Sequence, residues 1–281
     1  MTDAAFLPNH SRVTAKDAAP SRWMLALHGM LGSGGNLRGL ARRLVDACPD
    51  WGVVIVDLRM HGASQGAPPP HTIASTAEDL IRLEDALALP IAGALGHSFG
   101  GKVALTYLDH RHKAGRAPLA EAWVLEASPS AERPGGPGRL SSSTAMVMRM
   151  LRGVPQPLPS RERFFAIVEE HGLPRSIAEW LAMNLRHTDD GFRLRIDFDA
   201  IEALTADYLA TDLWYVLEQP GFADHMHVII GDQSTTLDDE DRARLATLPH
   251  VHAHLVPEAG HWVHVDAPDA VFEIMRRALA G

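Results

Sequence analysis

The stretch Gly96-His97-Ser98-Phe99-Gly100-Gly101 follows an apolar run at residues 91–95 and precedes a helical pattern that continues to residue 110. It is a G-x-S-x-G pattern at a turn between a strand and a helix. Such a turn is too sharp for side chains at Gly96 and Gly100, and it lifts the Ser98 hydroxyl clear of the sheet edge. The helix N-terminus directs backbone N–H groups at developing negative charge. We therefore predict that Ser98 is a nucleophile rather than an incidental serine in a glycine-rich turn.

Apolar runs alternate with helical patterns on both sides of this turn. The apolar runs lie at residues 23–27, 53–56, 91–95, 123–125, 227–230 and 253–256, and the helical patterns at 36–47, 75–87, 99–110 and 268–279. This alternation is typical of βαβ units and a parallel sheet. Because the runs are mainly apolar rather than alternating, we expect helices on both faces of the sheet. The predicted fold class is α/β.

The alternation breaks once, between residues 128 and 220. A loop at residues 133–138, rich in proline and glycine, is followed by helical patterns at 141–151, 161–171, 176–186 and 198–217. About ninety residues of mainly helical sequence form an insertion rather than a structureless loop. We predict a core made of residues 1–129 and 221–281, with residues 130–220 as a helical lid. The lid should cover the C-terminal ends of the strands, where open α/β sheets bind ligands.

Composition restricts the class of partner. The chain has 281 residues and a net charge of −9 with histidines neutral, which disfavours a sequence-independent nucleic-acid binder. No apolar stretch approaches the length of about 18 residues needed to span a membrane, and no secretory signal pattern opens the chain. A single cysteine excludes an intrachain disulfide. We expect an acidic cytoplasmic protein with a small-molecule substrate and no nucleic-acid or membrane partner.

A second glycine-rich motif follows the first strong strand run. It reads Leu27-His28-Gly29-Met30-Leu31-Gly32-Ser33. Acyl transfer needs hydrogen-bond donors for a tetrahedral oxyanion, and the backbone N–H groups of Met30 and Phe99 are the candidates. We interpret His28 as structural, bridging the loop beneath the site. The motif lacks the lysine and the spacing of phosphate-binding loops.

The third motif, Gly260-His261-Trp262, follows the last apolar run after a short loop. A serine hydroxyl is a weak nucleophile and needs a base near neutral pH. His261 is the predicted base, because it lies C-terminal to the serine in the chain order Ser, acid, His. His264 is the weaker candidate.

Taken together with the block Asp57-Leu58-Arg59-Met60-His61-Gly62-Ala63-Ser64, these motifs resemble the α/β-hydrolase superfamily. Within it, the chain is similar to small bacterial carboxylesterases and their mitochondrial abhydrolase relatives, which share an Asp-x-Arg-x-His-Gly-x-Ser block and a Gly-His-Ser-x-Gly-Gly-Lys turn. The resemblance runs from residue 23 to the C-terminus and is weak in the insertion. It implies an α/β-hydrolase fold and cofactor-free hydrolysis of esters or thioesters, with Arg59 and His61 bracing the loop beside the site.

The acid that orients the base does not stand at the usual place. The resemblance implies a carboxylate after the strand that ends at residue 230, three positions after a glycine. The sequence there reads Gly231-Asp232-Gln233-Ser234, so a serine occupies that position. A serine cannot carry the charge that stabilises an imidazolium.

Two nearby carboxylates are candidate replacements. Glu126 ends the strand that follows the nucleophile strand in sequence, and some relatives carry an acid in a segment resembling Glu126-Ala127-Ser128-Pro129. Asp232 lies two positions early in its loop. We favour Glu126. Remoter candidates, in the insertion, are Asp199 and Asp207.

The predicted enzyme is a serine carboxylesterase in which His261 removes the Ser98 proton and Ser98 attacks an acyl carbonyl. No metal or organic cofactor is expected, because the histidine pairs at 110/112, 225/227 and 252/254 lack the spacing of metal-binding motifs. Carbon–carbon bond hydrolysis and cofactor-free perhydrolysis remain alternatives on the same machinery, since a fold does not fix its reaction. A ligand-binding protein without turnover is the alternative from another class.

Overall fold

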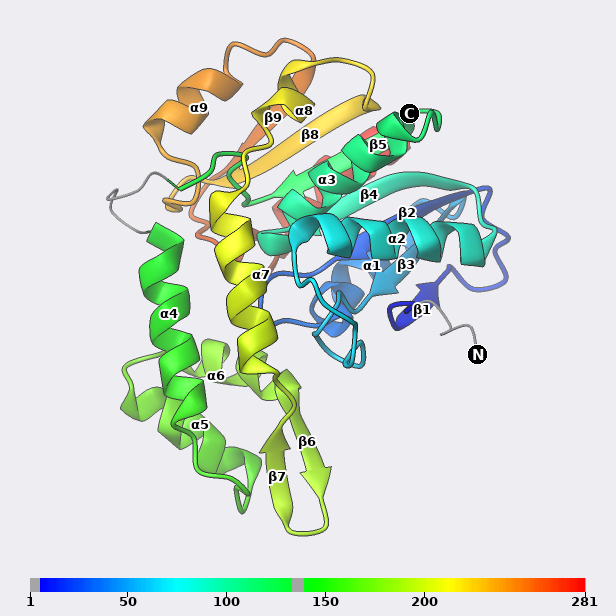
Figure 1. Cartoon of the computed structure of the whole chain (residues 1–281). Coiled ribbons are helices and arrows are strands. Elements are labelled where there is room, and N and C mark those ends of the chain that lie inside the picture. Colours follow the sequence, from blue (N-terminus) through cyan, green and yellow to red (C-terminus); the bar gives the residue numbers. More distant parts are fainter. Residues whose placement is uncertain (1–5, 133–138, 281) are drawn as a thin grey trace.

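A mostly parallel sheet of seven strands forms the centre of the computed structural model, which describes residues 6–132 and 139–280 (Figure 1). The strand order is β1-β3-β2-β4-β5-β8-β9, and only β1 runs antiparallel to its neighbour. The strands are β1 (His10–Val13), β2 (Arg22–Leu27), β3 (Trp51–Val56), β4 (Ile91–His97), β5 (Leu119–Leu125), β8 (Ala223–Gly231) and β9 (Val251–Val256). The six apolar runs of the sequence all lie in strands of this sheet, as predicted.

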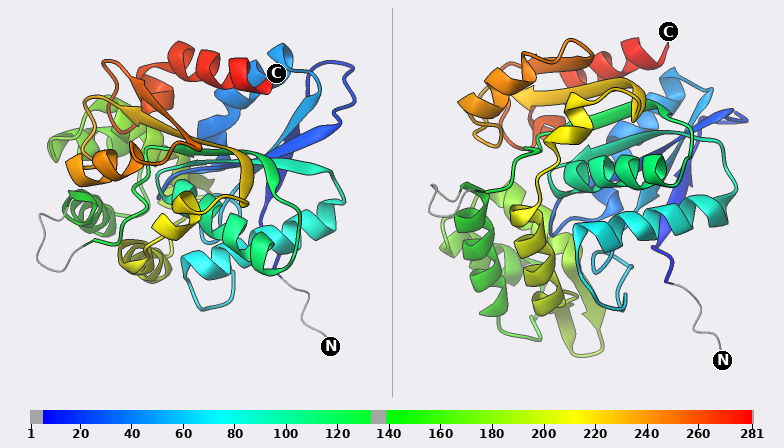
Figure 2. Two further views of the ribbon diagram at one scale, coloured as in Figure 1. Left: turned by 90° about the horizontal axis from the view of Figure 1, so that it is seen from above. Right: turned by 45° about the horizontal axis from the view of Figure 1, so that its top comes forward.

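Helices cover both faces of the sheet, so its strands are buried on two sides (Figure 2). The first face packs against α2 (Ile73–Leu87) and α3 (Phe99–Lys113). The second packs against α1 (Arg38–Ala47), which follows a short 3-10 turn (Gly34–Leu37), and α11 (Pro268–Leu279). Two short helices, α9 (Asp239–Leu245) and α10 (Val263–Asp266), flank β9 in sequence. The predicted α/β class, with helices on both faces, is confirmed.

The insertion at residues 130–220 is mainly helical and also contains a small hairpin. Its elements are α4 (Arg139–Arg152), α5 (Arg161–Glu170), α6 (Arg175–Leu181), a 3-10 turn (Ala182–Asn184), β6 (Leu185–Thr188), β7 (Gly191–Leu194), α7 (Phe198–Ala210) and α8 (Trp214–Glu218). The predicted loop at 133–138 lies outside the described residues. The pattern at 198–217, expected as one helix, is broken where the Leu213 N–H donates to the Pro129 carbonyl at 2.8 Å. This bond turns α8 back onto the core.

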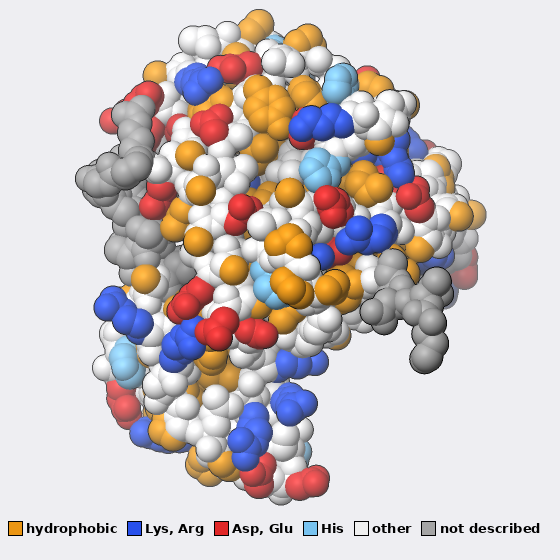
Figure 3. Space-filling view, in the orientation of Figure 1, with side chains coloured by type: hydrophobic (Ala, Val, Ile, Leu, Met, Phe, Trp, Pro, Cys, Tyr) orange, Lys and Arg blue, Asp and Glu red, His pale blue; other side chains and the backbone are white. Residues whose placement is uncertain are grey.

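The β6–β7 hairpin and β1 were not predicted. The hairpin strands are antiparallel and four residues long, and apart from the buried Leu185 their residues are half-buried or exposed, so they lack a continuous apolar run. β1 is a polar strand at the edge of the sheet, held by pairing with β3. Acidic and basic side chains are interspersed over the face of the molecule in Figure 3. Over residues 6–132 and 139–280, no helix is both long and apolar enough to cross a membrane.

The register of the sheet brings three loops to one edge. His97 pairs with Leu125, and Leu125 pairs with Ile229, so β4, β5 and β8 end nearly level. The carboxyl ends of parallel strands meet at the same sheet edge, so the residues that follow these strands lie together. Ser98 and Glu126 each come directly after their strand.

Candidate active site

Ser98 lies on a strained turn between β4 and α3. Its φ of 54° and ψ of −116° are rare for a residue with a side chain. A Cβ at Gly96 would stand 2.0 Å from the Gly100 carbonyl oxygen, and one at Gly100 would stand 2.4 Å from the Leu27 carbonyl oxygen. The two glycines are therefore required by close backbone approach, as the sequence predicts.

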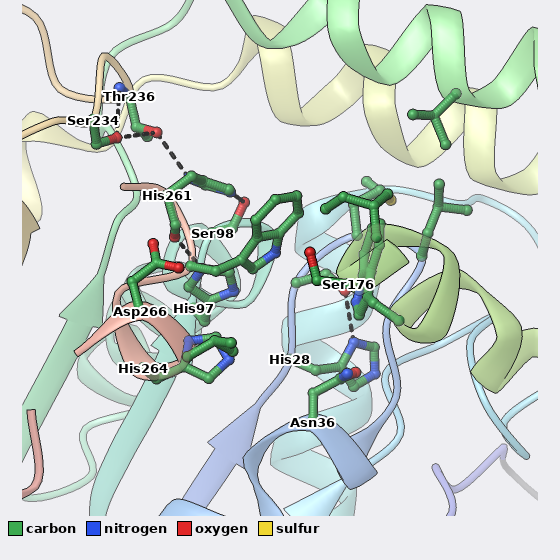
Figure 4. Close-up of a pocket in the computed structure, with 18 of the residues that line it drawn as sticks. His28, Asn36, His97, Ser98, Ser176, Ser234, Thr236, His261, His264 and Asp266 are labelled. Carbon is green, nitrogen blue, oxygen red and sulfur yellow. Dashed lines mark hydrogen bonds between the residues drawn. The ribbon is translucent and has the colours of Figure 1, made fainter. Parts of the chain in front are cut away.

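His261 faces the serine from the loop after β9. Its Nε2 lies 3.0 Å from Ser98 Oγ, within hydrogen-bond distance (Figure 4). The backbone of His261 is held from below, because His97 Nε2–H donates to the His261 carbonyl at 2.8 Å. Burial lowers the pKa of His97 well below its usual value, so His97 acts here as a neutral donor. The two predicted residues Ser98 and His261 thus meet in the structure.

Glu126 is fully buried behind His261. The Gly231 N–H donates to its Oε1 at 2.6 Å, and the Ser234 hydroxyl donates to its Oε2 at 2.5 Å. Oε2 lies 3.5 Å from His261 Nδ1. Asp232, the alternative acid, has an exposed side chain. The serine at the usual acid position therefore binds the carboxylate that comes from the neighbouring strand.

Thr236 was not singled out by sequence reasoning. Its Oγ1 lies 2.8 Å from His261 Nδ1, nearer than the Glu126 carboxylate, and 3.1 Å from Ser234 Oγ. Figure 4 shows Ser98, His261, Thr236 and Ser234 in one line of hydrogen bonds. The only signal in the sequence is the hydroxyl-rich segment at residues 234–236, which stands where the usual acid loop would be.

The two amides predicted to hold an oxyanion come from the loop after β2 and from the start of α3. Phe99 is the first residue of α3, where backbone N–H groups have no acceptor within the helix. Met30 lies in a turn that is closed by a bond from the Gly32 N–H to the Gly29 carbonyl at 3.0 Å. This bond does not use the Met30 N–H. The use of both amides as oxyanion donors stays a prediction.

His28 fixes this loop from beneath. Its Nε2 accepts the Leu58 N–H at 3.0 Å, so its proton lies on Nδ1, which donates to the Gly29 carbonyl at 2.8 Å. Burial lowers its pKa, in keeping with a neutral ring. The structural interpretation of His28 agrees with these bonds.

Arg59 and His61 brace the neighbouring loop. The Arg59 guanidinium binds both oxygens of Asp79 on α2, at 2.7 and 3.0 Å, and the Pro68 and Pro70 carbonyls. His61 is buried, its Nδ1 donates to the Arg59 carbonyl at 2.9 Å, and burial lowers its pKa to about 3. The bracing function that the family resemblance implies fits these contacts.

A cavity of about 490 Å³ opens above Ser98, between the core and the insertion. This is the size range of pockets for small organic ligands. Its lining from the insertion is mainly apolar and includes Met146, Val147, Leu173, Ile177 and Trp180. Met148 and Met150 are buried inside the insertion instead. Core loops supply the opposite wall, with Trp262 5.7 Å from Trp180 between ring centroids.

Lys102 of α3 ties both ends of the insertion to the helix that follows Ser98. Its buried ammonium group donates to three backbone carbonyls, those of Ser130 at 2.8 Å, Tyr208 at 2.7 Å and Thr211 at 2.8 Å. Burial lowers its pKa to about 8. The lysine of the Gly-Gly-Lys motif is thus a structural link rather than a reacting group.

The weaker candidates lie elsewhere. His264 packs edge-on against His97, with ring centroids 4.5 Å apart, and burial lowers its pKa to about 4. Asp199 pairs with Arg152 at the surface, and Asp207 accepts the Ile73 N–H at 2.7 Å. Among the described residues, no group of three or more His, Cys, Asp or Glu side chains is arranged to hold a metal ion.

The mostly parallel sheet, the insertion and the strand–turn–helix that carries Ser98 define the α/β-hydrolase class. The chain belongs to the alpha/beta hydrolase family, whose family model matches residues 24–274. It is 28% identical to Esterase YbfF of Escherichia coli (strain K12) over 270 residues, covering 95% of this chain and 96% of the relative. It is 26% identical to the sn-1-specific diacylglycerol lipase ABHD11 of Mus musculus over 263 residues, covering 90% of this chain and 80% of the relative.

The fold is also shared with solved structures. A marine microorganism esterase superposes with a TM-score of 0.80 at 20% identity, covering 97% of this chain and 99% of the other. At this identity the likeness concerns the fold alone.

Proposed function

We propose that this α/β hydrolase cleaves carboxylic esters or thioesters through an acyl-enzyme formed on Ser98. The observation that carries the proposal is the 3.0 Å approach of His261 Nε2 to a serine held on a strained turn. The names of the esterase and lipase relatives support it independently. Glu126 is the proposed acid, because it is the buried carboxylate at His261 Nδ1.

In the proposed reaction, His261 Nε2 accepts the Ser98 proton while Ser98 Oγ bonds to the acyl carbon. The carbonyl oxygen becomes an oxyanion that the Met30 and Phe99 amides stabilise. His261 then donates its proton to the departing alcohol or thiol. A water molecule, deprotonated by His261, attacks the acyl carbon and releases the acid and Ser98.

The cavity favours an apolar acyl group on the side of the insertion. The wall there is made of aliphatic, methionine and tryptophan side chains. Burial of apolar surface contributes about 25 cal/mol per Å² of surface removed from water, so each added methylene of the acyl chain should strengthen binding until the wall is reached. We propose that residues 130–220 form a lid whose inner face binds the acyl chain.

A panel of p-nitrophenyl esters of increasing acyl length, with an acyl-CoA beside them, tests this function. The wild-type protein should hydrolyse the esters, with KM falling as the chain lengthens, and Ser98→Ala should lose turnover. Strict preference for the acyl-CoA would identify thioesters as the substrate. Undiminished hydrolysis by Ser98→Ala would rule out the proposed acyl-enzyme.

A further inference from the structure

A hydroxyl group stands between the base and the acid. Thr236 Oγ1 lies 2.8 Å from His261 Nδ1, whereas Glu126 Oε2 lies 3.5 Å from the same nitrogen. The first distance is an ordinary hydrogen bond and the second is too long for a strong one. The direct hydrogen-bond partner of Nδ1 is therefore Thr236.

The protons of these groups can be placed because a hydroxyl has only one to donate. Ser234 donates its proton to Glu126 over 2.5 Å, the shorter of its two contacts. Ser234 Oγ also has donor geometry in the 3.1 Å contact to Thr236 Oγ1, but its single proton is already used in the shorter bond, so we assign the proton of this contact to Thr236. This leaves a lone pair on Thr236 Oγ1, which accepts the proton of His261 Nδ1. His261, Thr236 and Ser234 thus each donate a hydrogen bond to the next group, and the last acceptor is the Glu126 carboxylate.

The direction of this chain decides the tautomer of the base. With the proton on Nδ1, the lone pair on Nε2 faces the Ser98 hydroxyl, as proton removal requires. The reverse direction would need a protonated Glu126 and would place a proton on Nε2. In the productive direction both carboxylate oxygens of Glu126 accept hydrogen bonds, Oε1 from the Gly231 N–H at 2.6 Å and Oε2 from the Ser234 hydroxyl at 2.5 Å.

We propose that Thr236 is a positioning residue for the base. Its hydroxyl accepts the Nδ1 proton of His261, holds the ring in the productive tautomer and connects it to the charge of Glu126. This inference rests on the proposed function, since it concerns the base of that reaction. Thr236 touches no reacting atom.

A purely structural function of Thr236 would use different atoms. The Thr236 backbone N–H donates to Ser234 Oγ at 3.2 Å, and this bond shapes the loop whatever side chain is present. Thr236→Val removes the hydroxyl and nearly keeps the volume, whereas Thr236→Ser keeps the hydroxyl and removes a methyl group. Thr247→Val is a matched control, because the Thr247 hydroxyl is exposed and donates to the Arg244 carbonyl at 2.7 Å, away from the site.

The test compares kcat, KM and the pH dependence of kcat/KM for these variants on a p-nitrophenyl ester. Thr236→Val should lose about 10- to 100-fold in kcat with little change in KM, the effect of one hydrogen bond to a group that becomes charged. The acidic limb of the kcat/KM profile of Thr236→Val should move to lower pH, because the hydrogen bond that stabilises the His261 imidazolium is lost. Thr236→Ser and Thr247→Val should behave like the wild type.

The inference would be overturned if Thr236→Val kept the kcat and the pH profile of the wild type. Equal losses of kcat in Thr236→Ser and Thr236→Val would overturn it as well. If Thr236→Val does not fold, Thr236→Ala is measured instead with the same expectations. Ser98→Ala is measured in parallel. Full turnover by Ser98→Ala would reject the proposed function, whereas lost turnover by Ser98→Ala with normal Thr236→Val would reject only the inference on Thr236.

Discussion

Glu126→Gln replaces the buried carboxylate by an amide of nearly the same shape. The carboxylate accepts two donors, the Gly231 N–H and the Ser234 hydroxyl. An amide has one acceptor oxygen and one NH₂ group, so the side that faced Ser234 becomes a donor. Ser234 must then accept, and its own proton turns toward Thr236. The hydroxyl chain reverses and places His261 in the tautomer that cannot remove the Ser98 proton.

The size of the effect follows from the geometry. A unit charge 3.5 Å from the imidazolium ring interacts with it by about 5 kcal/mol at an effective dielectric constant of about 20. A loss of about 1.4 kcal/mol in transition-state stabilisation is tenfold in rate. We therefore expect kcat to fall by about a thousandfold or more, because the lost charge and the wrong tautomer act together.

The assay is steady-state hydrolysis of a p-nitrophenyl ester by Glu126→Gln, with thermal unfolding to show that the variant is folded. Asp232→Asn is the control, because Asp232 is the other candidate acid and its side chain is exposed. It should keep wild-type turnover. Near-normal turnover by Glu126→Gln together with a loss of orders of magnitude in Asp232→Asn would refute the assignment of the acid.

Three further predictions concern stability. Gly96→Ala should prevent folding to a soluble protein, because its Cβ would stand 2.0 Å from the Gly100 carbonyl oxygen; normal expression and a wild-type melting temperature would contradict this. Lys102→Met should lower the unfolding free energy by about 3 kcal/mol, since three buried or partly buried carbonyls lose their donor, and should speed amide exchange at residues 208–213. His61 has a pKa of about 3 in the fold against 6.5 in the unfolded chain, so protonation favours unfolding as the pH falls below 6.5. Its share of the unfolding free energy should fall by about 2 kcal/mol between pH 7.5 and 5, and denaturant unfolding that is independent of pH over this range would argue against it.

The sequence predicts the sheet well, because the central strands are largely buried on both faces and are therefore mainly apolar. The strands it misses have mostly exposed or half-buried side chains. β1 is short and mostly polar, with Val13 as its one buried residue, and it pairs with β3 at the edge of the sheet. The β6–β7 hairpin and the break between α7 and α8 depend on contacts with distant residues, such as the bond from Leu213 to Pro129.

In the candidate site, a residue can be predicted from the sequence when neighbouring residues in the chain determine its position. Ser98 stands in a turn whose glycines are needed by the backbone itself, so the motif identifies it. Glu126 depends on the alignment of β5 with β8, and only the three-dimensional register shows that it reaches the loop at 231–234. Thr236 depends on side-chain orientation, which no motif encodes.

The most direct test of the central claim is to treat the protein with a fluorophosphonate and map the adduct by mass spectrometry. A serine activated by His261 should form one covalent adduct on Ser98, and Ser98→Ala should form none. A folded wild-type protein that stays unmodified, or an unchanged adduct in Ser98→Ala, would contradict the account.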